Sequence, residues 1–329
     1  MGTVRAGSLV VEKGAKAKKI LRVFSMAGGD SGIPVVVING VEDGPVVNLH
    51  AGIHGDEFEG IRAIWKLVEQ IEPRNLSGAI IATPIVHLAA YAAGTRESPI
   101  DGKNLARVFP GDPSGTATDK LAHFFFNEII LKSDYALGLH SGGFRYKFHP
   151  VVEYYSGIKR EVEEKTKTIA EAFAIGPFNI IQRLPVPPIN VTCTYAASQH
   201  DIPSIEPEMW GEGRCNPENV GEYADSVLNV LRHLNMIKDG EQKTSPKIDH
   251  VEGAWVLAKN GGLFVPNVKI RDTVSKDQNV AVIKNDFGET IEEVKASADG
   301  FVSVMRTFSM IRPGDWAVQI VWPVKQKME

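Results

Sequence analysis

VVNLHAGIHGDE, at residues 46–57, is the stretch that decides the fold. Residues 46–50 are mostly apolar and predict a buried strand, which runs into a turn containing Gly52 and Gly55. From Glu57 onward, apolar residues recur at helical spacing. The buried face of that helix would consist of Ile61, Ile64, Leu67, Val68 and Ile71. A strand that leads through a tight turn into a helix is the unit from which α/β folds are built.

Strands and helices continue to alternate on both sides of this stretch. We expect further strands at residues 34–39, 78–83, 134–139 and 202–205. We expect further helices at 118–131, 159–173 and 216–234. This alternation predicts an α/β domain with a mainly parallel, mixed sheet. Residues 84–117 lack clear periodicity, and a loop of that length in a compact domain is usually functional.

The pattern changes after a polar stretch at 238–247. From Val251 onward, short strands alternate with glycine-rich turns and no helix is predicted. We therefore expect an α/β domain at 1–240 and an all-β barrel or sandwich at 241–329.

Residues 295–316 are similar to a biotinyl or lipoyl hairpin, but no lysine stands at the tip. This segment should instead pack against the first domain, where it would shape a pocket or an oligomer contact.

Composition excludes some classes of partner. The chain has 329 residues, 36 lysines and arginines, 40 aspartates and glutamates, and a net charge of −4. Nucleic acid is not expected as a partner, because phosphate binding needs a basic surface. No segment reaches the ~20 apolar residues of a membrane span, and no signal peptide is predicted. Because no apolar span is predicted, we expect no membrane partner. Cys193 and Cys215 form no disulfide framework, so we expect a reducing, cytoplasmic location.

Three side chains are candidates to hold a metal ion. His54 and Glu57 form an H-x-x-E pair at the strand-to-helix turn. His140 ends a predicted buried strand and is followed by Ser141-Gly142-Gly143. Side chains at the carboxyl ends of parallel strands meet at one edge of a sheet. Two imidazoles and one carboxylate are typical of a catalytic zinc site with an open coordination position, so we predict one Zn²⁺ per chain.

Each part of this pattern also has a simpler explanation. An H-x-x-E pair often arises by chance, and His140 alone could be a hydrogen-bonded core histidine. His50 stands four residues before His54, a spacing that would suit a metal on a helix. Because His50 lies on a predicted strand, we interpret it as structural.

Four motifs, in this order, resemble the succinylglutamate desuccinylase/aspartoacylase family, which is related to the zinc carboxypeptidases. They are VVNLHAGIHGDEFEG (46–60), DGKNLARVFPG (101–111), GLHSGG (138–143) and IPSIEPEMWGEG (202–213). The resemblance covers roughly residues 20–325. It implies a carboxypeptidase-like α/β/α domain followed by a β-domain. It also implies hydrolysis of N-acyl amino acids or similar small amides.

The resemblance assigns roles to the metal ligands and to a base. His54 and Glu57 match the first two zinc ligands of the family, and His140 matches the third. Glu208 falls on the general base. Alternation along a strand puts Glu206 on the same face, so spacing alone does not separate these two carboxylates.

The resemblance also assigns substrate contacts. Arg107 matches an arginine that grips the substrate carboxylate, and Asn104 of the same motif is assigned to substrate binding with it. Arg96 resembles an arginine placed near the scissile carbonyl, where it would act in catalysis.

Several positions depart from the pattern of the family, and the motif around Glu208 carries Glu-Pro and Met-Trp where smaller residues are often seen. Ala106 stands where the family usually has an asparagine that helps to bind the carboxylate. Gly138 replaces a usual aspartate, and His87 stands where asparagine is common. None of these changes removes a metal ligand. Together they suggest an unusual substrate, without the standard acidic side chain.

We therefore predict a zinc-dependent hydrolase that cleaves a C–N bond other than a peptide bond in a small N-acylated amino acid or amine. Zinc would activate water and Glu208 would act as the base. The alternative is a zinc carboxypeptidase for short peptides, which would need an open cleft. A binding protein on a retired hydrolase fold would instead need a broken set of ligands. The expected partners are a small-molecule substrate and further copies of the chain in a homo-oligomer.

Overall fold

The computed structural model describes residues 2–27, 29–156, 158–174, 179–183, 192–243 and 249–324. The stretch 238–247, expected to link two domains, lies outside these residues from 244 onward. None of the described helices is long and apolar enough to cross a membrane.

Helices and strands alternate through the first part of the chain. Up to residue 211 the strands are β1 (Thr3–Ala6), β2 (Leu9–Glu12), β3 (Lys16–Met26), β4 (Gly29–Asn39), β5 (Glu42–Ala51), β6 (Ser77–Thr83), β7 (Tyr135–Leu139), β8 (Tyr146–Tyr155), β9 (Asn179–Arg183) and β10 (Ser204–Gly211). The α-helices are α1 (Glu59–Gln70), α2 (Leu88–Ala93), α3 (Ala117–Glu128), α4 (Arg160–Phe173), α5 (Cys193–Ser198) and α6 (Pro217–His233). Short 3₁₀ turns are formed by Pro73–Asn75, Leu105–Arg107 and Ile130–Lys132.

A mixed sheet of twelve strands forms the centre, in the order β13-β16-β18-β11-β9-β8-β10-β7-β5-β6-β4-β3. In its middle, β6, β5, β7 and β10 pair in parallel. Strand β4 pairs antiparallel with β6 on one side, and β8 pairs antiparallel with β10 on the other. The expected α/β fold is confirmed: the parallel strands are central, and antiparallel strands extend the sheet on both sides.

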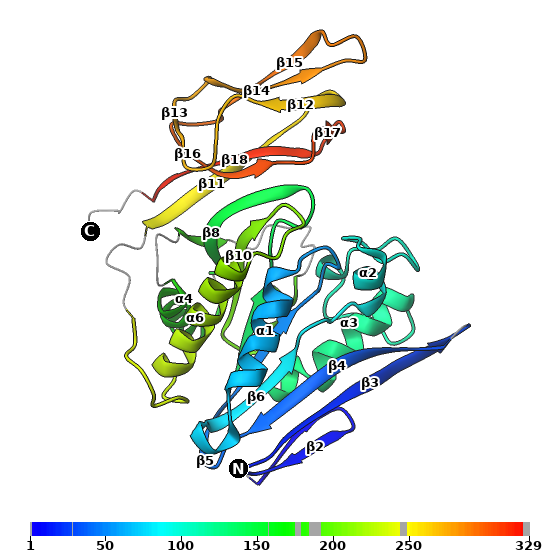
Figure 1. Ribbon diagram of the computed structural model, residues 1–329, viewed down its shortest axis with the longest axis vertical. Helices are drawn as coiled ribbons and strands as arrows, with labels where there is room; N and C mark the ends of the chain where they lie inside the picture. The colour runs from blue at the N-terminus through cyan, green and yellow to red at the C-terminus, as the bar shows by residue number, and fades with distance from the viewer. Residues whose placement is uncertain are drawn as a thin grey trace.

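Helices cover both faces of this central part (Figure 1). On one face, α1, α4 and α6 share an apolar core that includes Leu67, Ile169 and Val227. On the other face, α3 and α5 share a second core that includes Phe125 and Ala197, and the β1–β2 hairpin packs into it. The periodic apolar residues of the sequence thus produce three layers, with a buried sheet between two helical layers.

Three segments begin, end or fold differently from what the sequence predicts. Helix α1 begins at Glu59, two residues after the start expected at Glu57, so Glu57 lies in the turn before the helix. Strand β10 begins at Ser204 and continues to Gly211, beyond the expected end at 205. The region 84–117, expected to be a functional loop, contains α2 and a 3₁₀ turn.

The C-terminal region consists of strands among its described residues, as expected. They are β11 (Asp249–Leu257), β12 (Gly262–Pro266), β13 (Thr273–Val274), β14 (Asn279–Lys284), β15 (Thr290–Lys295), β16 (Gly300–Arg306), β17 (Met310–Ile311) and β18 (Trp316–Pro323). A separate four-stranded antiparallel sheet has the order β15-β14-β12-β17. The other four strands belong to the large sheet, and the whole region lies at the upper end of the molecule in Figure 1.

Hydrogen bonding continues across the domain boundary expected at residue 240. Strand β11 pairs in parallel with β9, and β16 pairs antiparallel with β8. One apolar cluster combines Tyr146, Phe148 and Val151 of β8 with Val304 of β16 and Val321 of β18. The two regions therefore share a sheet and a core, and two independent domains stay a prediction.

Removal of residues 241–329 tests whether 1–240 is an independent unit. We expect the truncated chain to lose cooperative folding, because β8 and β9 would become open edges and their apolar cluster would lose half of its members. Circular dichroism during heating and limited proteolysis would measure this. A truncated chain that melts cooperatively near the temperature of the full chain would establish 1–240 as a domain of its own.

Candidate active site

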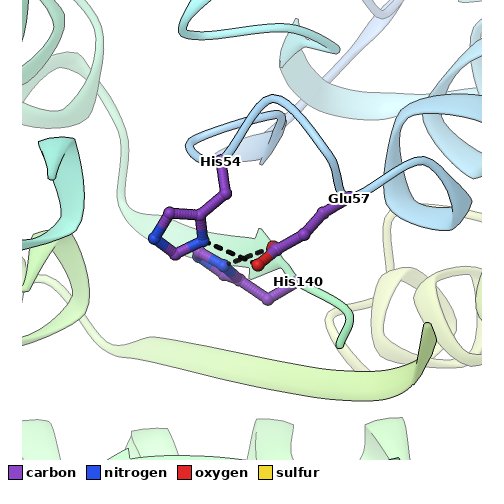
Figure 2. Close-up of side chains that lie close together, drawn as sticks. All are labelled: His54, Glu57 and His140. Atoms are coloured by element: carbon purple, nitrogen blue, oxygen red, sulfur yellow. Dashed lines mark hydrogen bonds and ion pairs between the residues drawn. The ribbon is translucent and has the colours of Figure 1, made fainter. Parts of the chain in front are cut away.

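The turn between β5 and α1 carries the first two residues of the site. Gly52 adopts a left-handed backbone, with φ of 63°. A Cβ atom at Gly55 would overlap the backbone of Ala90, so only glycine fits there. This tight turn directs His54 and Glu57 toward the same point, as Figure 2 shows.

His140 reaches this point from the neighbouring parallel strand. It directly follows β7, which is paired with β5 so that His50 lies beside Gly138. Nδ1 of His140 lies 2.9 Å from Oε2 of Glu57, and Nδ1 of His54 lies 2.7 Å from Oε1 of Glu57 (Figure 2). All three side chains are buried. The structure thus brings together the two imidazoles and the carboxylate that the sequence proposed as a set.

The Glu57 carboxylate has two further donors. Arg96 donates from Nη1 to Oε1 at 2.9 Å, and the backbone N–H of Ser141 donates to Oε2 at 3.2 Å. Burial favours the neutral form of Glu57, but electrostatic interactions and hydrogen bonds with His54 and His140 outweigh burial and hold the pKa of Glu57 well below its usual range. Glu57 is therefore ionised at neutral pH.

The two imidazoles differ in charge. Burial, helped by the charge of Arg96, lowers the pKa of His54 to about 4. Burial acts in the same direction on His140, but the Glu57 carboxylate, followed by Glu206 and Glu208, raises the pKa of His140 to about 9. At neutral pH a proton on His140 therefore balances this group of carboxylates. A divalent cation held by neutral imidazoles would supply positive charge to the same groups.

Glu206 and Glu208 of β10 lie on the other side of His140. A parallel bridge pairs His140 with Glu208, and Nε2 of His140 lies 3.8 Å from Oε1 of Glu206. Oε2 of Glu208 is buried and accepts no hydrogen bond from any described residue. Burial, together with the charge of Glu57, raises the pKa of Glu208 well above its usual range. A buried carboxyl group whose pKa is raised is a stronger base than an ordinary one and is suited to accepting a proton.

A cavity of about 220 Å³ opens beside these groups. Of the residues singled out in the sequence, His54, Arg96, Arg107 and Glu208 line it. Asn104, expected to bind substrate, instead places its Oδ1 3.2 Å from Nε2 of His54. It therefore contacts the imidazole on the side opposite Glu57.

Aromatic side chains that the sequence did not single out close the cavity. Tyr146 and Phe148 come from β8, and Trp255 and Trp316 come from β11 and β18. Thr192, just before α5, also lines the cavity. No local motif marks the four aromatic residues, because the pairings of β8 with β16, β16 with β18 and β18 with β11 bring them together.

The glycine that departs from the family pattern has a structural explanation. A Cβ atom at Gly138 would lie 2.7 Å from Nε2 of His50 on the adjacent strand. His50 is fully buried, hydrogen-bonded to Oδ1 of Asn48 at 2.7 Å, and packed edge-on against Phe125. Burial lowers the pKa of His50 to about 3, so it is neutral. The imidazole of His50 fills the space that a side chain at residue 138 would need.

Of the departures at residues 87 and 106, His87 has a structural role for its side chain, and the structure shows only a backbone contact for Ala106. His87 caps α2, because its Nδ1 accepts a hydrogen bond from the backbone N–H of Ala90. The carbonyl oxygen of Ala106 accepts a hydrogen bond from Nη1 of Arg107 at 2.9 Å. Arg107 is therefore held by the backbone of the preceding residue, and this contact does not depend on the side chain at residue 106.

Comparison with known proteins places the chain in a family. The family model described as succinylglutamate desuccinylase/aspartoacylase catalytic domain matches residues 43–234. A relative from Halomonas elongata, N-alpha-acetyl-L-2,4-diaminobutyric acid deacetylase, is 31% identical over 290 residues, which cover 86% of this chain and 83% of the relative. The chain therefore belongs to the succinylglutamate desuccinylase/aspartoacylase family.

Solved structures agree with this membership. The succinylglutamate desuccinylase/aspartoacylase from Rhodobacter sphaeroides superposes with a TM-score of 0.87 at 26% identity, over 98% of this chain and 99% of that one. The product-bound ectoine utilization protein EutE (DoeB) from Ruegeria pomeroyi has the same TM-score at 24% identity, over 95% and 97% of the two chains, and so shares the fold. The family model and the Halomonas elongata relative support a hydrolase that acts on amide bonds, and a small-molecule substrate is consistent with them.

Gly138→Ala tests the packing of His50. We expect this substitution to lower the free energy of unfolding by about 1–3 kcal/mol, the usual effect of forcing an extra methyl group into a packed core. Urea titration would measure it. Gly221→Ala in α6 is the matched control, because a Cβ atom there would lie 3.9 Å from Nζ of Lys66, an ordinary contact with a flexible side chain. Alanine should stabilise the helix by up to ~1 kcal/mol. Equal stability of Gly138→Ala and the wild type would contradict the conclusion that the imidazole of His50 fills the space next to residue 138.

Proposed function

We propose that the protein is a zinc-dependent deacylase that hydrolyses the amide bond of a small N-acylated amino acid. One observation carries the proposal: potential ligand atoms of His54, Glu57 and His140 all lie within 4.8 Å of one another in a buried site beside a cavity. Two imidazoles and a carboxylate form the usual protein ligand set of a catalytic zinc ion.

The surroundings of these residues also fit zinc. Metal-bound histidines usually have a second partner on the other ring nitrogen, which fixes the orientation of the ring. Asn104 occupies that position for His54, at 3.2 Å from Nε2. Glu206 lies 3.8 Å from Nε2 of His140 and carries a charge of the right sign. We therefore propose that Asn104 positions a metal ligand, in place of the substrate-binding role expected from its motif.

Three residues around the cavity have separate roles in hydrolysis of the amide bond. Zinc, when bound, supplies Lewis acidity toward a water molecule and the scissile carbonyl. Glu208 takes a proton from that water and passes it to the leaving amine, because its buried oxygen faces the site without another partner among the described residues. Arg96 donates hydrogen bonds to the developing oxyanion, and Arg107 holds the carboxylate of the amino acid.

The cavity favours a small substrate over a peptide. A carboxypeptidase would need an open cleft, but Trp255 and Trp316 stand against the cavity, and its volume of about 220 Å³ is small. Ligand pockets of drug size typically enclose ~300–1,000 Å³. We would therefore screen the purified protein for hydrolysis of N-acetyl, N-succinyl and N-formyl amino acids. Nα-acetyl-2,4-diaminobutyrate belongs in the same screen, because the Halomonas elongata relative is named for its deacetylation. A cytoplasmic location and a homo-oligomer stay predictions.

Loss of either imidazole should remove the metal. We expect His54→Ala and His140→Ala to lower bound zinc from about one equivalent per chain to background, with loss of activity, because two remaining ligands hold zinc weakly. Elemental analysis of the purified variants would measure this. His250→Ala is the control, because His250 is exposed on β11. Unchanged zinc content in both site variants would exclude the proposed metal site.

The base is tested separately from the metal. Glu208→Gln keeps the shape of the side chain but cannot accept a proton, so we expect zinc to stay bound while kcat falls ~10²–10⁴-fold. Steady-state kinetics and zinc content would be measured on the same preparation. Glu206→Gln should lower kcat far less. A larger loss of kcat in Glu206→Gln would assign the base to Glu206 instead.

A further inference from the structure

We propose that Glu59 of α1 is a positioning residue for the base Glu208, and that it acts through a hydrogen bond to the end of β10. This inference rests on the proposed function, because it assigns a residue that acts on the base of that reaction. Glu59 is absent from the residues that line the cavity, so it would influence the reaction only through another residue.

Glu59 is a buried carboxylate that contacts β10. Its side chain is 1% exposed, and its Oε1 accepts a hydrogen bond from the backbone N–H of Gly211 at 3.1 Å. Glu59 is the first residue of α1, and Gly211 is the last residue of β10. Because a buried carboxylate is costly without hydrogen-bonding partners, this contact ties the start of the helix to the end of the strand.

The pairing of β10 with β8 is irregular directly after the base. Glu208 lies opposite Val151, but Trp210 lies opposite Phe148, so the register shifts between Glu208 and Trp210. Such a β-bulge bends the pairing and re-aims side chains, and bulges are common next to active sites. The direction of the Glu208 carboxylate therefore depends on the conformation that the chain adopts immediately after it.

That conformation is a run of left-handed residues. Trp210 has φ of 57°, Gly211 of 126°, Glu212 of 62° and Gly213 of 62°. A positive φ is unfavourable for the two residues that carry a side chain. A Cβ atom at Gly211 would lie 2.3 Å from the carbonyl oxygen of Tyr146, so the turn is also tightly packed. Strained backbone of this kind persists only where its surroundings hold it.

Hydrogen bonds hold this turn from two directions. The backbone N–H of Glu212 donates to the carbonyl oxygen of Tyr146 at 3.0 Å, and that of Gly213 donates to the carbonyl oxygen of Gly143 at 2.6 Å. These bonds tie the turn to the chain that follows His140. Glu59 ties it to α1. Loss of the Glu59 carboxylate would release the turn on the α1 side and allow Glu208 to shift.

Kinetics of Glu59 variants test the positioning role, with zinc-loaded protein and the fastest substrate of the amino-acid screen, which includes Nα-acetyl-2,4-diaminobutyrate. We expect Glu59→Ala to lower kcat ~10–100-fold with little change in KM or zinc content, because a displacement of about 1 Å can cost ~10²-fold in rate. Glu59→Gln keeps an oxygen that can accept the N–H and should recover most of kcat. Glu69→Ala, the same substitution at an exposed position of α1, is the control and should change nothing.

A double substitution shows whether Glu59 acts through the base. Added to Glu208→Gln, Glu59→Ala should lower kcat by less than about twofold, because the group that it positions is already inactive. A full, independent loss in the double variant would overturn the inference. Loss of zinc from Glu59→Ala would also overturn it, because Glu59 would then act on the metal ligands.

Hydrogen exchange at the backbone N–H of Gly211 tests the contact without a substrate. Measured relative to Leu49 in the core of β5, exchange should be ~10–100-fold faster in Glu59→Ala than in the wild type, and close to the wild type in Glu59→Gln. Unchanged exchange in Glu59→Ala would overturn the inference, whereas a wild type that hydrolyses none of the screened amides would overturn the deacylase function. If Glu59→Ala does not fold, Glu59→Met replaces it, because methionine fills a similar volume without a carboxylate.

Discussion

The buried carboxylate of Glu57 is the constraint on which the site depends. An ionised carboxylate removed from water is costly unless charged and hydrogen-bonding partners surround it. Here the partners come from separate parts of the chain: the imidazoles of His54 and His140, the guanidinium of Arg96 and the N–H of Ser141. These partners satisfy both oxygens only if the turn after β5, the end of β7 and the chain after α2 meet at one point.

The parallel sheet makes this meeting possible. The register of β5 with β7 sets His50 beside Gly138, and two residues further along β7 the chain delivers His140. The bridge between His140 and Glu208 then aligns β10 with the same edge. A slip of one residue in either pairing would turn the side chains to the opposite face. The apolar patterns that bury this sheet therefore also fix the distances between the charged groups.

The sequence predicts those parts of the site that local patterns determine. Buried strands ending near His54 and His140 follow from apolar runs and glycine turns, whereas Arg107 is indicated only by the resemblance to the family. Spacing along β10 does not separate Glu206 from Glu208, because both side chains point to one face and both line the cavity. Tyr146 and Trp316 could not be predicted at all. They meet through strands separated by many residues, as does the contact between Tyr146 and Arg306, 160 positions apart. The contact of Asn104 with His54 could not be predicted either, since its motif does not say which neighbour it touches.

The sheet that runs unbroken from β8 into β16 and β18 has a consequence for how such a protein evolves. The strands that carry the tryptophans are held by backbone hydrogen bonds, which do not depend on side-chain identity. Exchanges at these ring positions can therefore retune which molecules enter, while the residues around Glu57 remain in place. Divergence of specificity within one scaffold would then be found on β11 and β18, far along the chain from the reacting groups.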